Sequence, residues 1–170
     1  MGVAEIGVAT GLGRGSLYHH IESKEELLYN IASRYVAELV RAGREITARE
    51  QDPIERLREL SKHLMSIVSM HLAEMTVCFR EIHSLSSERH EVVSKLHLDY
   101  QQIWEDAVAA GVARGVFRPV DRVAIKGLLG MYFYSFLWLK PDGKQSVEEI
   151  AGVFSDLVIR SLLADQPAPP

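Results

Sequence analysis

The 170-residue chain contains one cysteine, Cys78, and only 12 glycines and six prolines. A single cysteine excludes a disulfide within the chain, which favours a reducing compartment. The longest apolar stretch, residues 128–139, is too short to cross a bilayer, which takes about 20 residues. No basic and apolar leader of the secretory type is recognised. We therefore expect a cytoplasmic globular protein with no membrane partner.

The sequence also lacks the alternation of apolar and polar residues that is typical of half-buried strands. Apolar residues recur instead at helical spacing, from Leu27 to Ile46 and again from Leu57 to Ile67. With 47% hydrophobic residues, a chain of this length can form a sizeable core without metals or disulfides. The fold class predicted is all-α.

Local signals set the bounds of the predicted helices. Asp52 before Pro53 is a typical helix start, Ser146 with Glu149 matches a capping box, and Gly115 suits a left-handed closing residue. The helices predicted after residue 22 span residues 23–46, 53–71, 72–82, 86–114, 121–139 and 146–163. Residues 125–139, IKGLLGMYFYSFLWL, are apolar nearly all round, so most of that helix must be covered.

The N-terminal residues carry a different pattern. Residues 3–10 can form a short helix, Gly11-Leu12-Gly13 permits a tight reversal, and a second short helix runs over residues 14–20. Two short helices joined by a glycine turn predict a helix-turn-helix, whose second helix lies in the major groove of DNA. Leu17 and Ile21 are four residues apart and can face inward together.

The outward side chains of this second helix suit contacts to duplex DNA. Arg14 can bind a phosphate or, with two hydrogen bonds, a guanine. The hydroxyls of Ser16 and Tyr18 suit phosphate oxygens, and two histidines follow. Lys24 lies in the first turn of the next helix, where free amide groups favour an anion. The formal charge of −4 does not itself indicate a nucleic-acid partner, but a local patch is compatible with that total.

The stretch GLGRGSLYHHIESKEELL, residues 11–28, resembles the DNA-binding motif of the TetR (tetracycline repressor) family of bacterial regulators. The resemblance implies a helix-turn-helix domain over residues 1–28, a helical ligand-binding and dimerisation domain over residues 29–164, and a disordered tail over residues 165–170. It implies a ligand-responsive regulator, a repressor that binds a palindromic operator as a homodimer through residues 121–163. Carried onto matching positions, it places the DNA contacts at Arg14, Gly15, Ser16, Tyr18, His19, His20 and Lys24.

The motif departs from the family pattern in three places. Ile21 stands where the family usually has an aromatic residue, and Gly13 stands at the usual serine or threonine cap. Residues 1–28 leave no room for the family's first helix, so we expect this domain to be incomplete at its N-terminus. Truncation, a misplaced start codon or a helix that is absent would each account for this. Two basic residues against four acidic ones in this segment predict weak DNA affinity.

The effector expected from the resemblance is a small hydrophobic molecule. The segment ARGVFRP, residues 113–119, with the aromatic helix after it, resembles TetR-type regulators of lipid and sterol breakdown, several of which respond to acyl-CoA thioesters. Arg80 or Arg89 would then bind a phosphate of coenzyme A. The alternative is that both are solvent-exposed side chains without a ligand role. Ordinary core packing is the alternative for each ligand-binding candidate. The candidates are Met65, Met70, Met75, Phe79, Tyr100 and Trp104.

Catalysis is not expected, because the sequence has no glycine-rich phosphate loop and no credible nucleophile arrangement. His83, His90 and His97 recur every seven residues, without the four-residue spacing of a zinc-binding helix. We therefore expect no metal and no cofactor. A helical small-molecule-binding protein that does not bind DNA remains the alternative function, and a small helical enzyme is a third. Steep salt dependence of binding to duplex DNA would favour the regulator.

Overall fold

The computed structural model describes residues 24–164, and these residues form helices with no strand among them. Residues 1–23 of the predicted helix-turn-helix domain (residues 1–28) and the predicted tail over residues 165–170 lie outside the described residues. The elements are α3 (Lys24–Arg49), α4 (Pro53–Met70), α5 (Leu72–Glu81), η1 (Ile82–Ser84), α6 (Ser87–Ala113), α7 (Arg122–Tyr134), η2 (Ser135–Leu137) and α8 (Val147–Leu162). The all-α prediction is confirmed.

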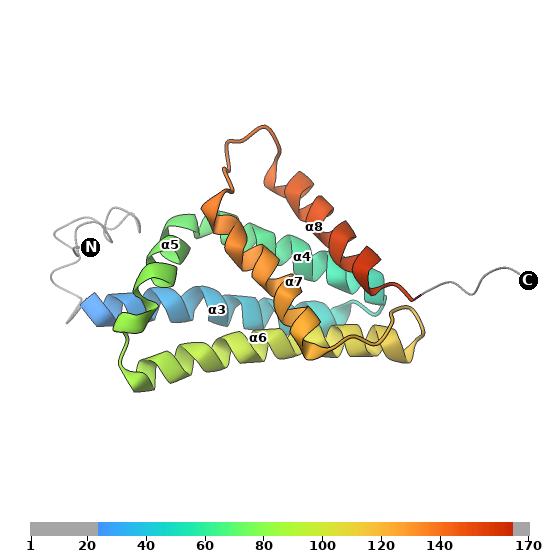
Figure 1. The fold of residues 1–170 in the computed structure, drawn as a ribbon, viewed down its shortest axis with the longest axis horizontal. Helices are drawn as coiled ribbons and strands as arrows, with labels where there is room; N and C mark the ends of the chain where they lie inside the picture. Colours follow the sequence, from blue (N-terminus) through green and yellow to red (C-terminus); the bar gives the residue numbers. More distant parts are fainter. Residues whose placement is uncertain (1–23, 165–170) are drawn as a thin grey trace, which may run out of the picture.

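The long helices α3 and α6 lie side by side and run in the same direction, while α4 returns along the bundle and leads into α5 (Figure 1). Helix α8 packs along α4, and α7 crosses the bundle between α6 and α5. The predicted stripe on α3, from Leu27 to Ile46, is buried in this arrangement. No helix among residues 24–164 is long and apolar enough to span a membrane.

Side-chain caps begin three of these helices, and the sequence predicts two of them, at Asp52 and Ser146. Asp52 accepts hydrogen bonds from the amides of Ile54 (2.9 Å) and Glu55 (3.0 Å), with Pro53 in the first turn of α4. Ser146 and Glu149 form a reciprocal capping box at the start of α8. The carboxylate of Asp121 likewise accepts from the Val123 amide at the start of α7 (2.7 Å). These caps satisfy amide groups that the first turn of a helix leaves without partners.

The end of α6 depends on two glycines. Gly115 has φ +71°, in the left-handed region, and it closes the helix as predicted. The chain then folds back so that the Phe117 ring lies against Gly111. A Cβ atom at Gly111 would lie 2.0 Å from Cδ2 of Phe117, so a side chain at Gly111 is incompatible with this packing. The close approach of Phe117 buries its ring and turns the chain toward α7.

A hydrogen-bonded group of buried side chains joins α7 to α4. The Tyr132 hydroxyl donates to Oγ of Ser61 (2.7 Å), and the Ser135 hydroxyl donates to the carbonyl oxygen of Tyr132 (2.6 Å). The Tyr132 ring also contacts the rings of Trp104 and Phe154, with centroid distances of 5.7 Å and 5.1 Å. Because buried polar groups are costly without partners, this group fixes the position of α7 on the bundle.

The apolar residues of α7 and α8 are only partly covered. Ile125, Leu129 and Tyr132 are buried. A second set faces solvent in the single chain, at Val123, Tyr134, Leu137, Trp138, Val153 and Leu157. Phe154 and Leu157 both follow the helical spacing along α8, yet Phe154 is buried whereas Leu157 is 53% exposed. Helix α8 is apolar on two sides, so periodicity alone did not identify the side that packs on α4.

We predict that Gly111→Ala destabilises the protein by about 1–3 kcal/mol, because the new methyl group must displace the Phe117 ring. Urea unfolding measures this change. Gln102→Ala, at an exposed position of the same helix, is the control and should stay within about 0.5 kcal/mol of the parent. Equal stability of the two variants would contradict the tight Gly111–Phe117 contact.

Candidate functional site

A cavity of about 420 Å³ lies between α3, α5, α6 and the segment formed by α7 and η2. Its walls are mostly aromatic and aliphatic, and no lysine, arginine, aspartate or glutamate lines it. The lining residues are Tyr35, Met75, Cys78, Phe79, Ile82, His83, His97, Phe133 and Phe136. A cavity of this size and composition is typical of a site for a small, largely apolar molecule.

Helix α5 supplies one wall of the cavity. Met75, Cys78, Phe79 and Ile82 are three or four residues apart, so a single face of this short helix presents all of them. Helix α4 ends at His71, which lets α5 turn away from α4 and toward α6. The wall therefore depends on the interruption at His71, which separates α4 from α5.

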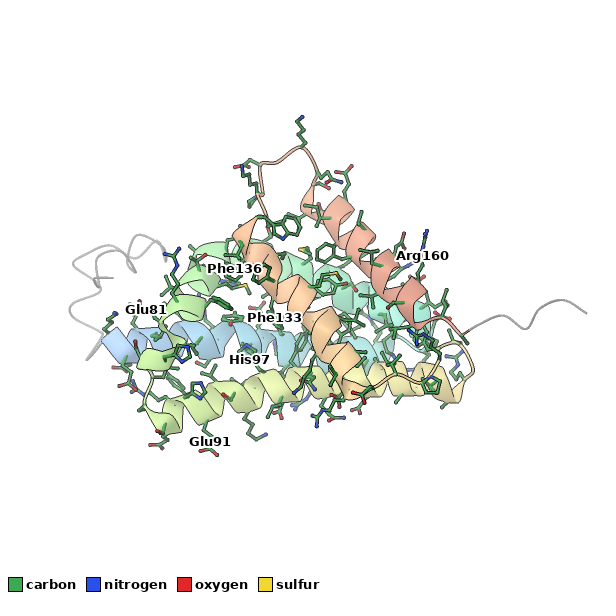
Figure 2. All side chains as sticks on the ribbon, in the orientation of Figure 1. Glu81, Glu91, His97, Phe133, Phe136 and Arg160 are labelled. Carbon is green, nitrogen blue, oxygen red and sulfur yellow. The ribbon has the colours of Figure 1, made fainter. Side chains whose placement is uncertain are left out.

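Aromatic rings from the other helices complete the enclosure. The His97 ring of α6 lies edge-on to Tyr35 of α3, with centroids 6.3 Å apart, and 5.8 Å from the ring of Phe133. Phe136 of η2 contacts Phe79 of α5, with a centroid distance of 5.3 Å. Figure 2 shows His97 and Phe133 on crossing helices, with Phe136 farther along toward α5. These contacts bring together four segments of the chain, α3, α5, α6 and the segment formed by α7 and η2.

Burial keeps three of the polar side chains that line this cavity uncharged at neutral pH. Burial lowers the pKa of His97, although its hydrogen bond to the Val93 carbonyl partly opposes that shift. Burial raises the pKa of the Cys78 thiol to about 12, and the charge of Glu74 adds to the shift. Burial also raises the pKa of Tyr35. Each group is therefore in its neutral form, because desolvation disfavours the charged form of each.

The structure places the six ligand-binding candidates in three environments. Met75 and Phe79 line the cavity. Met65, Tyr100 and Trp104 are fully buried in the core and are not among the lining residues, although the Tyr100 ring lies 6.4 Å from that of the lining Phe133. Met70 is exposed at the end of α4. The Tyr100 hydroxyl and the Trp104 indole N–H have no hydrogen-bond partner among the described residues. The Trp104 indole nevertheless partly offsets the rise that burial causes in the pKa of Tyr100.

Sequence reasoning did not identify Tyr35, His97, Phe133 and Phe136 as cavity residues. The sequence pattern assigned Tyr35 to the buried stripe of α3. It assigned Phe133 and Phe136 to the helix predicted to dimerise. His97 was weighed as a metal ligand. Among residues 24–164, no group of three or more histidine, cysteine or acidic side chains could hold a metal ion. Only the close packing of α6 against α7 shows these residues to be neighbours.

A second candidate region joins the start of α3 to the junction between α5 and α6. Nζ of Lys24 lies 2.9 Å from Oε2 of Glu81. The Glu25 carboxylate accepts a hydrogen bond from the Ser86 amide (2.8 Å), and Arg89 lies 3.8 Å from the same carboxylate. The backbone hydrogen bond from Ser86 lowers the pKa of Glu25, and the hydrogen bond from Lys24 lowers the pKa of Glu81. We call this set the α3–α5 junction.

Lys24 is the only predicted DNA-binding residue among the described residues. It is half-buried and paired with Glu81, so in this conformation its ammonium group is engaged within the chain. Arg89 is also engaged, because its guanidinium group lies 5.3 Å from the ring centroid of Tyr29 as well as near Glu25. Arg80 is exposed on α5, next to the cavity-lining Phe79.

Comparison with known proteins gives a consistent result. Residues 50–162 match the family model described as the tetracyclin repressor-like C-terminal domain. The chain is 28% identical over 163 residues to the HTH-type transcriptional repressor KstR2 of Rhodococcus jostii (strain RHA1), which covers 94% of this chain and 80% of the relative.

Two solved structures are similar along nearly the whole chain. The TetR family regulator PfmR from Thermus thermophilus has a TM-score of 0.82 and 32% identity, covering 94% of this chain and 88% of that one. AibR, solved with isovaleryl coenzyme A and operator DNA, has a TM-score of 0.72 and 26% identity, covering 96% of this chain and 87% of that one. The chain therefore belongs to the tetracycline-repressor-like family and is a transcriptional regulator, as the motif over residues 11–28 predicted.

We predict that the protein loses stability as the pH falls from about 7 to about 5. Burial lowers the pKa values of His97 and His63 in the folded state, from an ordinary value of 6.5. In this range the unfolded chain therefore binds more protons, and acid favours unfolding. Urea unfolding at the two pH values should show a smaller loss for His97→Phe than for the parent.

His90→Phe, an exposed position on the same helix, is the control for this comparison. It should keep the acid-dependent loss of the parent. If His97→Phe lost as much stability on acidification as the parent, His97 would not be buried in its neutral form.

Proposed function

We propose that the chain is a ligand-responsive repressor that binds a palindromic operator as a homodimer and leaves it when a small hydrophobic effector fills the cavity. The observation that carries this proposal is the position of the cavity, which is walled by α3, the helix that continues from the predicted reading head. The relative KstR2 is a repressor, and the similar protein AibR was solved with isovaleryl coenzyme A and operator DNA. KstR2 supports repression, and the AibR complex supports operator binding and an effector of the acyl-CoA class. We propose that the protein acts in the cytoplasm.

The cavity suits the acyl part of such an effector. Its described lining residues include no lysine, arginine, aspartate or glutamate, and His83 is exposed. The phosphates of coenzyme A would have to remain outside, where Arg80 is exposed beside Phe79. Arg80 is the better candidate for a phosphate contact than Arg89, because Arg89 is engaged with Glu25 and Tyr29.

Release from DNA requires that the effector bind the non-DNA-binding conformation more tightly. The α3–α5 junction offers a route, because Glu81 lies between Phe79 and Ile82, which both line the cavity. An effector that displaces this part of α5 also displaces the partner of Lys24. Arg14, Gly15, Ser16, Tyr18, His19, His20 and Lys24 are the proposed DNA contacts, of which the structure describes Lys24.

Titration of operator DNA with isovaleryl coenzyme A tests the proposal. The duplex is the one that the protein selects from a random pool, and its binding should weaken with added salt because phosphate contacts release counterions. Isovaleryl coenzyme A should release the duplex, while coenzyme A alone should release it less. Binding of the thioester without any DNA affinity would instead favour the alternative of a helical ligand-binding protein.

The dimer surface that we propose is the uncovered face of α7, η2 and α8. Val123, Tyr134 and Trp138 on one side and Val153 and Leu157 on the other remain exposed in a single chain. Two copies of this helix pair can form a four-helix packing about a twofold axis. A dimer of this kind places two reading heads on half-sites about 34–36 Å apart, which a palindromic operator requires.

We predict that the double substitution Val153→Glu and Leu157→Glu yields a monomer, because it introduces charges into the proposed apolar interface. Operator affinity should fall about a hundred-fold or more, since the second half-site no longer contributes. Sedimentation and DNA titration measure the two effects. Leu98→Glu, at a similarly exposed leucine on α6, is the control and should remain dimeric. A dimeric double variant would contradict the assignment.

We predict that Glu81→Gln strengthens operator binding a few-fold, a modest effect because water screens an accessible ion pair. The substitution frees Lys24 for a DNA phosphate. The same variant should respond less steeply to isovaleryl coenzyme A, because α5 has lost its ionic contact to α3. Glu91→Gln, an exposed position on α6, should leave both properties unchanged (Figure 2). Unchanged operator affinity in Glu81→Gln would exclude competition between Glu81 and DNA for Lys24.

A further inference from the structure

His97 has a fixed arrangement of protons. Its Nδ1 atom lies 3.0 Å from the carbonyl oxygen of Val93, one turn earlier in α6. A carbonyl oxygen can only accept, so Nδ1 carries the proton, and Nε2 of the neutral ring presents a lone pair. The rings of Tyr35 and Phe133 both pack against the imidazole, with centroid distances of 6.3 Å and 5.8 Å.

The lone pair on Nε2 is the unused hydrogen-bonding capacity of a residue that lines the cavity. None of the described residues donates a hydrogen bond to it, whereas Nδ1 is satisfied. Nε2 is therefore available to accept a hydrogen bond from a ligand group that donates one. The imidazole thus selects for a donor.

Tyr35 supplies the complementary group. It lines the same cavity, with its ring centroid 6.3 Å from that of His97. Within residues 24–164 no hydrogen bond engages its hydroxyl, which stays protonated because burial raises its pKa by disfavouring the phenolate. The two rings therefore offer one acceptor and one donor to the same region of an otherwise apolar cavity. A hydroxyl group both donates and accepts, so a single ligand hydroxyl can satisfy the two of them.

The same surroundings disfavour an anion. No arginine or lysine lines the cavity, and the neutral tautomer of His97 presents a lone pair rather than a proton. The nearby Glu74 carboxylate already raises the pKa of Cys78, and it would oppose a second negative charge in the same way. Burying an unpaired carboxylate here would carry a large desolvation cost.

We infer that His97 and Tyr35 form a recognition pair for the hydroxyl group of an uncharged alicyclic or aliphatic ligand moiety. The inference rests on the proposed function of the cavity as the effector site and adds to it the chemistry of the bound part. The pair discriminates between oxidation states of the same skeleton. An alcohol satisfies both residues, a ketone accepts from Tyr35 but leaves Nε2 of His97 without a donor, and a carboxylate meets no lysine or arginine among the described lining residues.

Calorimetric titration with three matched probes tests the inference on the full chain. The probes are decahydro-2-naphthol, 2-decalone and decahydronaphthalene-2-carboxylate, which share one bicyclic skeleton. We expect the alcohol to bind about ten-fold more tightly than the ketone, the worth of roughly one buried hydrogen bond. The carboxylate should bind most weakly. Equal or tighter binding of the ketone or the carboxylate, or no binding of the alcohol, would overturn the inference.

His97→Phe removes the acceptor and keeps an aromatic ring between Tyr35 and Phe133. It should abolish the preference for the alcohol, while binding of the ketone changes little. His90→Phe makes the same change at an exposed position of α6 and should keep the preference of the parent. A preference that survives in His97→Phe would overturn the assignment of Nε2 as the acceptor.

Tyr35→Phe is a second, independent variant in case His97→Phe does not fold. It removes the donor and should weaken the alcohol and the ketone alike, so their ratio should stay near that of the parent. Thermal unfolding of each variant shows whether it is folded. Operator release by isovaleryl coenzyme A is measured without these probes. A regulator that releases DNA but shows no alcohol preference would therefore refute the recognition pair alone.

Discussion

The structure depends on one continuous helix, α3, taking part in two sites at once. Its first turn is fastened to the α3–α5 junction through Lys24 and Glu25, and its middle contributes Tyr35 to the cavity wall. A helix is stiff over this length, because every turn is hydrogen-bonded to the next. A displacement of Tyr35 or of the adjacent α5 wall is therefore transmitted to Lys24, where α3 joins the predicted reading head.

The ion pairs of the junction are suited to a change of partner. Lys24 and Glu81 are both partly accessible to water, so separating them costs little compared with separating a fully buried pair. The apolar contacts of the same region are of another kind, since Leu27, Leu28 and Ile31 are buried under α5 and α6. The helix thus stays packed along its length while its terminal charges remain exchangeable.

The sequence predicted the fold well because its signals are local. Asp52, Ser146 and Gly115 each act on their own turn of the chain, and the spacing of Leu27 to Ile46 needs only a helix to be visible. The motif at residues 11–28 predicted the family by the same kind of short-range pattern. The cavity was less accessible, because Tyr35, His97 and Phe133 become neighbours only through the crossing of three helices. Helix α8 was ambiguous for a related reason, since a helix that is apolar on two sides does not indicate which side faces its own chain.

The hydrogen bond from Tyr132 to Ser61 gives the cavity walls unequal freedom. It ties α7 to α4, and so it holds Phe133 and Phe136 against the main body of the bundle. The opposite wall belongs to α5, a ten-residue helix that ends in a single 3₁₀ turn. A bulkier ligand would then be accommodated by an outward movement of α5 alone. The extent of that movement would make release from DNA depend gradually on ligand size, rather than switch between a bound and a released state.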